Sequence, residues 1–102
     1  MATFEVVVSS KAQSDLCECV SFLLRVSEEA ASALAEEIYA CLGSLSDFPE
    51  RNPLFPMPKA CPLAIRKQVI GKRYIALYAI EGQRIVVYRI IDTRRKFDYL
   101  LG

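Results

Sequence analysis

The chain has 102 residues, of which 53% are hydrophobic and 25% charged, and this balance predicts one folded domain that spans residues 1–102. The absence of histidine excludes a Ser-His-Asp or Cys-His catalytic triad and any metal site with histidine ligands. The net charge of +1 conceals unequal halves, because residues 1–50 carry two basic and nine acidic side chains, whereas residues 51–102 carry eleven basic and three acidic ones.

The N-terminal part of the chain predicts a strand followed by a helix. Residues 4–8 form a short β-branched run, which is typical of a strand. Ser10 and Gln13 match a capping box at the start of a helix, and apolar residues at helical spacing continue to about Arg25.

A second helix is predicted after Ser27, which is a suitable N-cap and is followed by two glutamates that favour the helix dipole. Its expected apolar stripe consists of Ala31, Leu34, Ile38, Cys41 and Leu45. Because few residues separate the two helices, we expect them to form an antiparallel hairpin.

A proline-rich connector follows the helices. All five prolines lie between residues 49 and 62, and proline lacks the N–H that the interior of a helix or a central strand requires. We expect an ordered loop, held against the domain by Phe48, Leu54, Phe55 and Met57.

Three strands are predicted after the connector, at residues 65–70, 74–80 and 84–91, with a turn in which Gly82 can adopt a positive φ. The last two are almost uniformly apolar, so both faces of the sheet should be covered. The helices cover one face, and a C-terminal turn at residues 94–101 or a partner covers the other. The predicted fold is therefore α+β, in the order β-α-α-β-β-β, with a helical hairpin on an antiparallel sheet and a short C-terminal helical tail.

The pairing of the last two strands has two possible registers. A two-residue turn at Glu81 and Gly82 places Tyr74 opposite Arg89 on one face, whereas a three-residue turn removes this pairing. The sequence does not decide between them.

The four cysteines lie at positions 17, 19, 41 and 61 and contain no Cys-x-x-Cys motif. We expect them to be small buried residues in a reducing cytoplasm. No apolar run reaches the about 18 residues of a membrane span, and no signal peptide is visible. These features predict a cytoplasmic protein that binds no membrane, metal or cofactor.

Basic residues are concentrated on the three C-terminal strands and at their ends. If the helices cover one face of the sheet, these cations should gather on the other face and attract an anionic target. The candidates are Arg66, Lys67, Lys72, Arg73, Arg89, Arg94 and Arg95. Four tyrosines lie among them: Tyr74, Tyr78, Tyr88 and Tyr99. Such a mixture can bind unstacked bases, although a solvated basic face with packed tyrosines accounts for the same composition.

Four segments, in their order and spacing, resemble one toxin superfamily. They are residues 10–16 (SKAQSDL), 45–49 (LSDFP), 74–78 (YIALY) and 87–95 (VYRIIDTRR). Through them nearly the whole chain resembles the RelE/ParE superfamily, the toxins of bacterial type II toxin–antitoxin pairs, often called plasmid stabilisation proteins.

This resemblance implies one of two activities. RelE-like members are ribosome-dependent endoribonucleases that cut mRNA, whereas ParE-like members poison DNA gyrase and cleave no RNA themselves. In both branches an antitoxin wraps its C-terminal segment around the toxin, which implies a hetero-oligomer with a cognate acidic antitoxin.

RelE-like cleavage without a metal requires a base, cations that stabilise the phosphate, and an acid for the leaving oxygen. The residues that the resemblance offers for this chemistry are Arg95, Arg94, Arg89, Arg73, Lys67, Lys72 and Tyr99. Arg95 matches the arginine after the last strand, and either lysine is a candidate base if neighbouring cations lower its pKa. Ile75 departs from the family pattern, which has an arginine at this position.

The segment from Arg89 to Arg95 is closer to the ParE pattern, in which the last strand ends in an arginine-rich motif. Asp92 departs from it, because many members carry histidine there.

We therefore predict a ParE-like growth inhibitor that acts on DNA gyrase and replication. Its target-binding residues would be Arg66, Lys67, Arg73, Tyr74, Arg89, Arg94 and Arg95. A RelE-like endoribonuclease that acts on the ribosome and mRNA is the alternative, and so whether the chain is an enzyme stays open. A non-toxic nucleic-acid-binding module or a decayed toxin is a third possibility.

Overall fold

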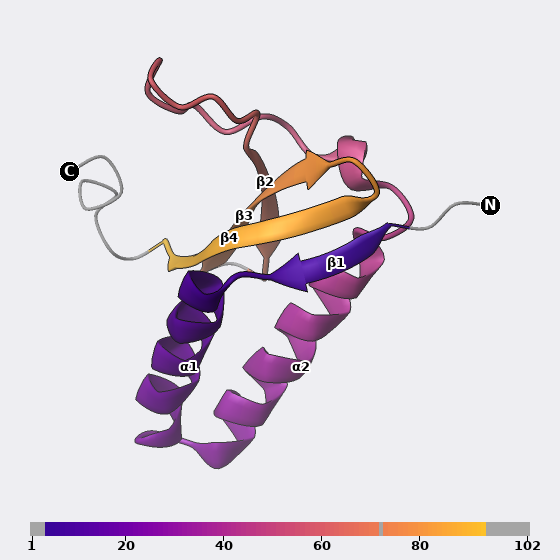
Figure 1. Ribbon diagram of the computed structural model, residues 1–102. Helices are drawn as coiled ribbons and strands as arrows, with labels where there is room; N and C mark the ends of the chain where they lie inside the picture. Colours follow the sequence, from indigo (N-terminus) through magenta and orange to yellow (C-terminus); the bar gives the residue numbers. More distant parts are fainter. Residues whose placement is uncertain (1–3, 72, 94–102) are drawn as a thin grey trace.

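The computed structural model describes residues 4–71 and 73–93, in which a helical hairpin packs against one face of a four-stranded sheet (Figure 1). The elements in chain order are β1 (Glu5–Val8), α1 (Ser10–Leu24), α2 (Glu28–Ser44), the 3-10 helix η1 (Pro49–Arg51), β2 (Arg66–Ile70), β3 (Tyr74–Glu81) and β4 (Arg84–Asp92). The predicted α+β class and element order are confirmed. The helical tail predicted at residues 94–101 lies outside the described residues.

The N-cap of α1 is Ser9, one residue before the predicted Ser10. Its Oγ accepts the backbone N–H of Ala12 at 3.1 Å and donates to the carbonyl oxygen of Tyr88 at 3.2 Å. The second bond explains the difference, because a contact with a strand far along the chain fixes where the helix begins.

The second cap is the predicted one, since Ser27 Oγ accepts the backbone N–H of Ala30 at 3.2 Å. Leu42 is 3% exposed and belongs to the buried stripe of α2, whereas the predicted Cys41 is only partly buried. The reason is helix geometry, because Leu42 lies four residues after Ile38 and therefore on the same face.

The strands are ordered β1-β4-β3-β2, with β1 parallel to β4 and the other pairs antiparallel. The sheet is thus mixed, not wholly antiparallel as predicted. A parallel pair needs a long connection, and the helical hairpin and two strands lie between β1 and β4 in sequence. β1 pairs only with the first part of β4, up to Val87. Beyond Val87, α1 contacts this edge of β4.

The β3–β4 hairpin has neither of the two registers considered from sequence. The turn consists of Gly82, with a φ of +63°, and Gln83, so that Glu81 pairs with Arg84. A β-bulge then shifts the register between Leu77 and Tyr78, and Tyr74 pairs with Asp92 at the far end. The positive φ predicted for Gly82 is confirmed, whereas Tyr74 and Arg89 are not opposite each other.

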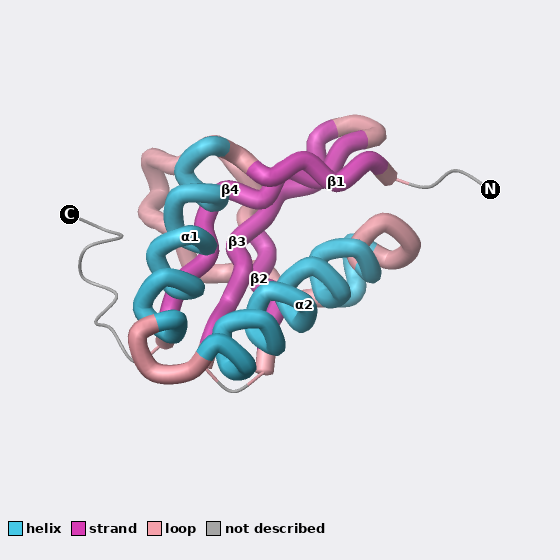
Figure 2. The backbone as a smooth tube through the Cα atoms, turned by 90° about the horizontal axis from the view of Figure 1, so that it is seen from below, coloured by secondary structure: helices cyan, strands magenta, loops and turns pink. Residues whose placement is uncertain are grey.

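The two faces of the sheet are buried by different parts of the chain. The helices cover one face, with α1 beside β4 and α2 on the β2 side (Figure 2). On the other face, Phe55 and Cys61 of the proline-rich connector pack against a second cluster, which contains Ile65, Ile75, Leu77, Ala79 and Ile91. Within the described chain, the connector is therefore what covers the second face.

The connector is ordered, as predicted, by pairing with β2. The backbone N–H of Phe55 donates to the carbonyl of Ile65 at 2.7 Å, and Leu54 forms a β-bridge with Arg66. The prediction about its side chains is wrong for three of the four residues, because Phe48, Leu54 and Met57 remain 69%, 58% and 37% exposed. The loop is instead held by its backbone pairing with β2 and by the packing of Phe55.

The four cysteines are free, and Cys17 is exposed while the other three are partly buried. The expectation of buried thiols is therefore wrong for Cys17. None of the helices in the described chain is long and apolar enough to cross a membrane.

Candidate functional site

The end of β4 is fixed by hydrogen bonds to the start of β3. Both the backbone N–H and the Oγ1 of Thr93 donate to the carbonyl oxygen of Arg73, at 2.6 and 2.9 Å. Arg73 itself is exposed at this edge. The next residues in sequence are the predicted site residues Arg94 and Arg95, which lie outside the described chain, as do Lys72 and Tyr99. We call the region around Arg73 and Thr93 the exit end of the sheet.

Arg89, a predicted site residue, is bound to a carboxylate of α1. Its Nε lies 2.7 Å from Asp15 Oδ2, and its Nη2 lies 3.3 Å from Asp15 Oδ1. The same Oδ2 accepts the backbone N–H of Ile90 at 3.0 Å, on the part of β4 that β1 does not reach. Arg89 thus fastens α1 to β4.

Asp15 is the residue that the sequence reasoning missed. It is 5% exposed and lies on α1 next to Leu16, which belongs to the core. A buried charge needs a partner and further hydrogen bonds, and Asp15 obtains both from Arg89 and Ile90. A carboxylate within an apolar helix face, together with an arginine in an apolar strand, was the available signal.

Arg66 and Lys67 differ in what they contact. Arg66 Nη1 donates to the carbonyl oxygens of Asn52 and Glu50, at 2.6 and 3.2 Å, and so holds the connector beside β2. Lys67 is half-buried and pairs with Leu77 of β3, which in turn pairs with Arg89. Lys67 and Arg89 therefore share one row across the sheet, but the guanidinium of Arg89 is bound to Asp15.

The tyrosines are mostly parts of the core. Tyr74 is 7% exposed and Tyr78 is fully buried, both in the cluster beneath the helices. Tyr78 Oη donates to the carbonyl of Pro49 at 2.5 Å and accepts from Asn52 Nδ2 at 3.1 Å. Neither ring is presented for stacking on a base.

Tyr88, at the bulge of β4, is half-buried on the opposite face and donates its Oη to Glu81 Oε2. This hydrogen bond, followed by burial and the negative charge of Glu81, raises the pKa of Tyr88 above the ordinary tyrosine value. A raised pKa keeps the phenol protonated. The phenol therefore keeps its hydrogen bond to Glu81, which stabilises the hairpin, and is not activated as a base.

A groove of about 360 Å³ lies between the helical hairpin and the exit end. Its walls include Leu23 and Ala33 from the helices and Tyr74 from the sheet, with Glu37 and Arg73 as its charged members. Gly71 forms part of the wall with a φ of +60°, and an added Cβ would lie 2.6 Å from Glu37 Oε1. A side chain at this position would therefore press against the carboxylate of Glu37.

The described part of the chain does not bring the predicted residues into one cluster. Arg73 is exposed at the exit end, Arg66 and Arg89 are held by carbonyls and a carboxylate, and Tyr74 is buried. Within residues 4–71 and 73–93, no group of three or more cysteine, aspartate or glutamate side chains is placed to hold a metal ion. Among the members of the predicted set that the structure describes, Arg73 at the exit end is the exposed cation.

Comparisons with known proteins agree with this architecture. A family model described as the ParE toxin of the type II toxin–antitoxin system parDE matches residues 6–97. Among solved structures, the chain is similar to a chain from the chromosomal ParDE toxin–antitoxin system of P. aeruginosa, with a TM-score of 0.72 and 17% sequence identity. That similarity covers 90% of this chain and 98% of the other, and at this identity it shows a shared fold. No curated protein matches the sequence.

Proposed function

We propose that this chain, which belongs to the ParE toxin family of type II toxin–antitoxin systems, acts on DNA gyrase and thereby blocks replication. We treat residues 1–102 as one toxin domain. Gyrase is the target that the ParE branch of the superfamily implies, and the surface proposed to reach it is the exit end with Arg73, Arg94 and Arg95.

The observation that carries the choice of target is the engagement of Arg89 and the tyrosines in structural contacts. RNA cleavage requires a base, a cation and an acid that converge on one phosphate. Arg89 is bound bidentately to Asp15, the rings of Tyr74 and Tyr78 are buried, and the raised pKa of Tyr88 favours its protonated form. The phenol proton of Tyr88 is itself engaged, because it is donated to Glu81. These contacts support target poisoning over nuclease chemistry.

We further propose that the partner is a cognate acidic antitoxin and that both proteins are cytoplasmic, where gyrase acts. The cationic exit end suits an acidic segment, since opposite charge accelerates and orients association. Such a segment would neutralise the toxin by covering Arg73 and the arginines that follow Thr93.

Two assays on the purified full chain test the target. In a DNA supercoiling assay with gyrase, we expect the chain to inhibit supercoiling and to accumulate cleaved DNA. In a ribosome-coupled assay, we expect mRNA to remain intact at the same concentration. Addition of the antitoxin encoded beside the toxin gene should restore supercoiling.

The opposite pattern would identify a RelE-like nuclease and overturn the choice of gyrase. If induced expression stops growth while both assays are negative, the target lies elsewhere. If expression does not stop growth at all, the chain is a non-toxic module or a decayed toxin.

A further inference from the structure

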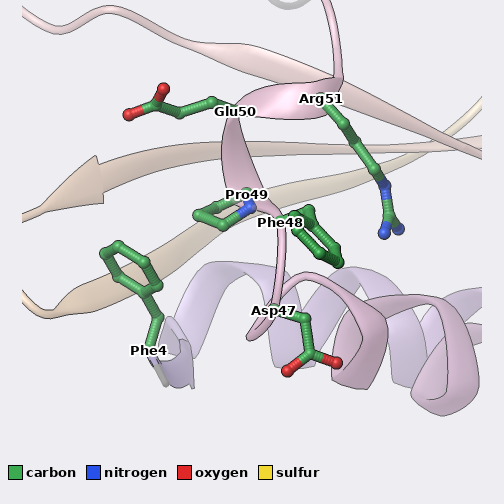
Figure 3. A pocket seen from close by; sticks show the side chains of 6 residues that line it. All are labelled: Phe4, Asp47, Phe48, Pro49, Glu50 and Arg51. Carbon is green, nitrogen blue, oxygen red and sulfur yellow. The ribbon is translucent and has the colours of Figure 1, made fainter. Parts of the chain in front are cut away.

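A pocket of about 350 Å³ lies at the other end of the sheet from the exit end. It is lined by Phe4, Asp47, Phe48, Pro49, Glu50 and Arg51 (Figure 3). Phe4 directly precedes β1, whose first residue pairs with Arg84 at the start of β4. We call this region, with the Gly82 turn, the turn end of the sheet.

The walls of the pocket are aromatic and are held in place by the backbone. Phe4 is half-buried, and the Phe48 side chain is 69% exposed, which leaves a large ring facing solvent. Figure 3 shows the Phe4 ring on one side of Pro49 and the Phe48 ring on the other. The backbone N–H of Phe4 donates to Ser46 at 3.0 Å, and Tyr78 holds the carbonyl of Pro49, so both walls are anchored to the core.

Two carboxylates and one guanidinium belong to the residues that line the pocket, so its lining carries a net negative charge. Asp47 and Glu50 place carboxylates at its rim, and both residues are exposed (Figure 3). Arg51 also lines the pocket, and its guanidinium is bound by neutral groups, since its Nη2 donates to Ser44 Oγ at 2.6 Å and to Gln68 Oε1 at 3.2 Å. Neither carboxylate takes part in the ion pairs found within residues 4–71 and 73–93.

We propose that this pocket binds an arginine side chain presented by a segment of a partner protein. A guanidinium stacks on the face of an aromatic ring, and its planar donors match carboxylates at the rim. The apolar methylenes of the arginine would contact Phe4 and Pro49, so that one side chain satisfies both the apolar wall and the acidic rim. The pocket lies at the opposite end of β4 from Arg73, so its occupation does not depend on the toxin's target.

The probe for this proposal is N-acetyl-arginine-N-methylamide, titrated into the full chain and followed by two-dimensional NMR. Its matched control is the citrulline analogue, which has the same shape and no charge. We expect the arginine probe to shift the signals of Phe4 and residues 47–51 and to bind at least about five-fold more tightly than the citrulline probe.

Two variants and one control locate the site. Phe48→Ala and Glu50→Gln should each weaken binding of the arginine probe by about two- to five-fold. Tyr39→Ala removes a similarly exposed aromatic ring, 62% exposed on α2, and should leave binding unchanged. Unchanged signals of Asp15 and Ile90 would show that each variant is folded.

Several results would overturn the proposal. Equal binding of the citrulline probe would mean that the pocket does not select a cation. Equal weakening by Tyr39→Ala, shifts confined to other surfaces, or no binding at all would mean that the pocket is not the site. Because none of these measurements requires toxicity, a failure here is distinct from a failure of the gyrase assay.

Discussion

The two ends of the sheet are built from different chemistry, although β4 runs through both. The exit end presents the cation of Arg73 and is held by the hydrogen bonds that the backbone N–H and the Oγ1 of Thr93 donate to the carbonyl of Arg73. The turn end presents the carboxylates of Asp47 and Glu50 beside two aromatic rings. A net charge of +1 thus describes neither end, and the near-neutral total is compatible with two surfaces that attract partners of opposite charge.

Between these ends, the bond of Asp15 to Arg89 fastens the helices to the sheet. It shows that one class of side chain has two roles in this chain, because Arg89 is structural while Arg73 remains exposed. The predictions below separate the two roles, starting with the largest expected effect.

Replacement of Asp15 by alanine should unfold a large fraction of the protein. It removes the carboxylate that binds the partly buried guanidinium of Arg89 and accepts the backbone N–H of Ile90. Loss of one partner of a buried pair lowers the free energy of unfolding by about 3–5 kcal/mol. Chemical denaturation followed by circular dichroism measures this change.

Two matched variants sharpen the same measurement. Asp15→Asn keeps an oxygen that can accept from Ile90 and should be less destabilising than Asp15→Ala. Lys11→Ala removes a cation that lies 4.0 Å from Asp15 but is 63% exposed, and should change stability by less than about 0.5 kcal/mol. If Asp15→Ala is no more destabilising than Lys11→Ala, Arg89 is not a structural residue.

The double variant Arg94→Ala, Arg95→Ala should abolish toxicity with little change in stability. These residues follow the fixed end of β4, and we propose that they contact the target. Growth after induced expression measures toxicity, and thermal unfolding measures the fold. The matched control is Lys59→Ala with Arg84→Ala, which removes two exposed cations that are not among the predicted site residues. Equal loss of toxicity in the control would indicate a dependence on total charge and not on this site.

The fold was largely predictable because its signals are local. The β-branched run, the Ser27 cap, the proline cluster and Gly82 each specify a backbone conformation within a few residues. The parallel pairing of β1 and the bulge at Tyr88 were not predictable, since both depend on contacts between residues far apart in sequence.

The candidate site was less predictable for the same reason. Residue type identified Arg66 and Arg89 as cations, but their partners, Asn52 and Asp15, come from other elements. Position in sequence groups Tyr74 with the basic residues. Alternation along β3 instead places its ring in the core beneath the helices.

Two glycines with positive φ test how rigid each end is. Gly71→Ala and Gly82→Ala should each lower stability by about 1–2 kcal/mol, because alanine is strained at φ values of +60° and +63°. Gly71→Ala should be the more destabilising, since its Cβ would also displace Glu37, whereas nothing lies within 4 Å at Gly82. Denaturation of both variants measures the difference, and equal losses would mean that Glu37 moves aside freely.

The smallest effect concerns the hydrogen bond between Tyr88 and Glu81, which joins β3 to β4 on the turn side of the bulge. Because the folded pKa of Tyr88 is raised above its unfolded value, the bond is fully present below the unfolded pKa and is lost as the pH rises through the folded one. Glu81→Gln should lower this pKa, as measured from the pH dependence of the Tyr88 ring signals in NMR. Glu5→Gln is the matched control, since Glu5 and Glu81 both pair with Arg84 but only Glu81 contacts the phenol.

At the exit end, the bonds of Thr93 to a backbone carbonyl should persist over the same pH range, so alkaline pH should loosen the turn end alone. Simultaneous loosening of both ends would show that β4 responds as one rigid unit and that the two ends are not independent.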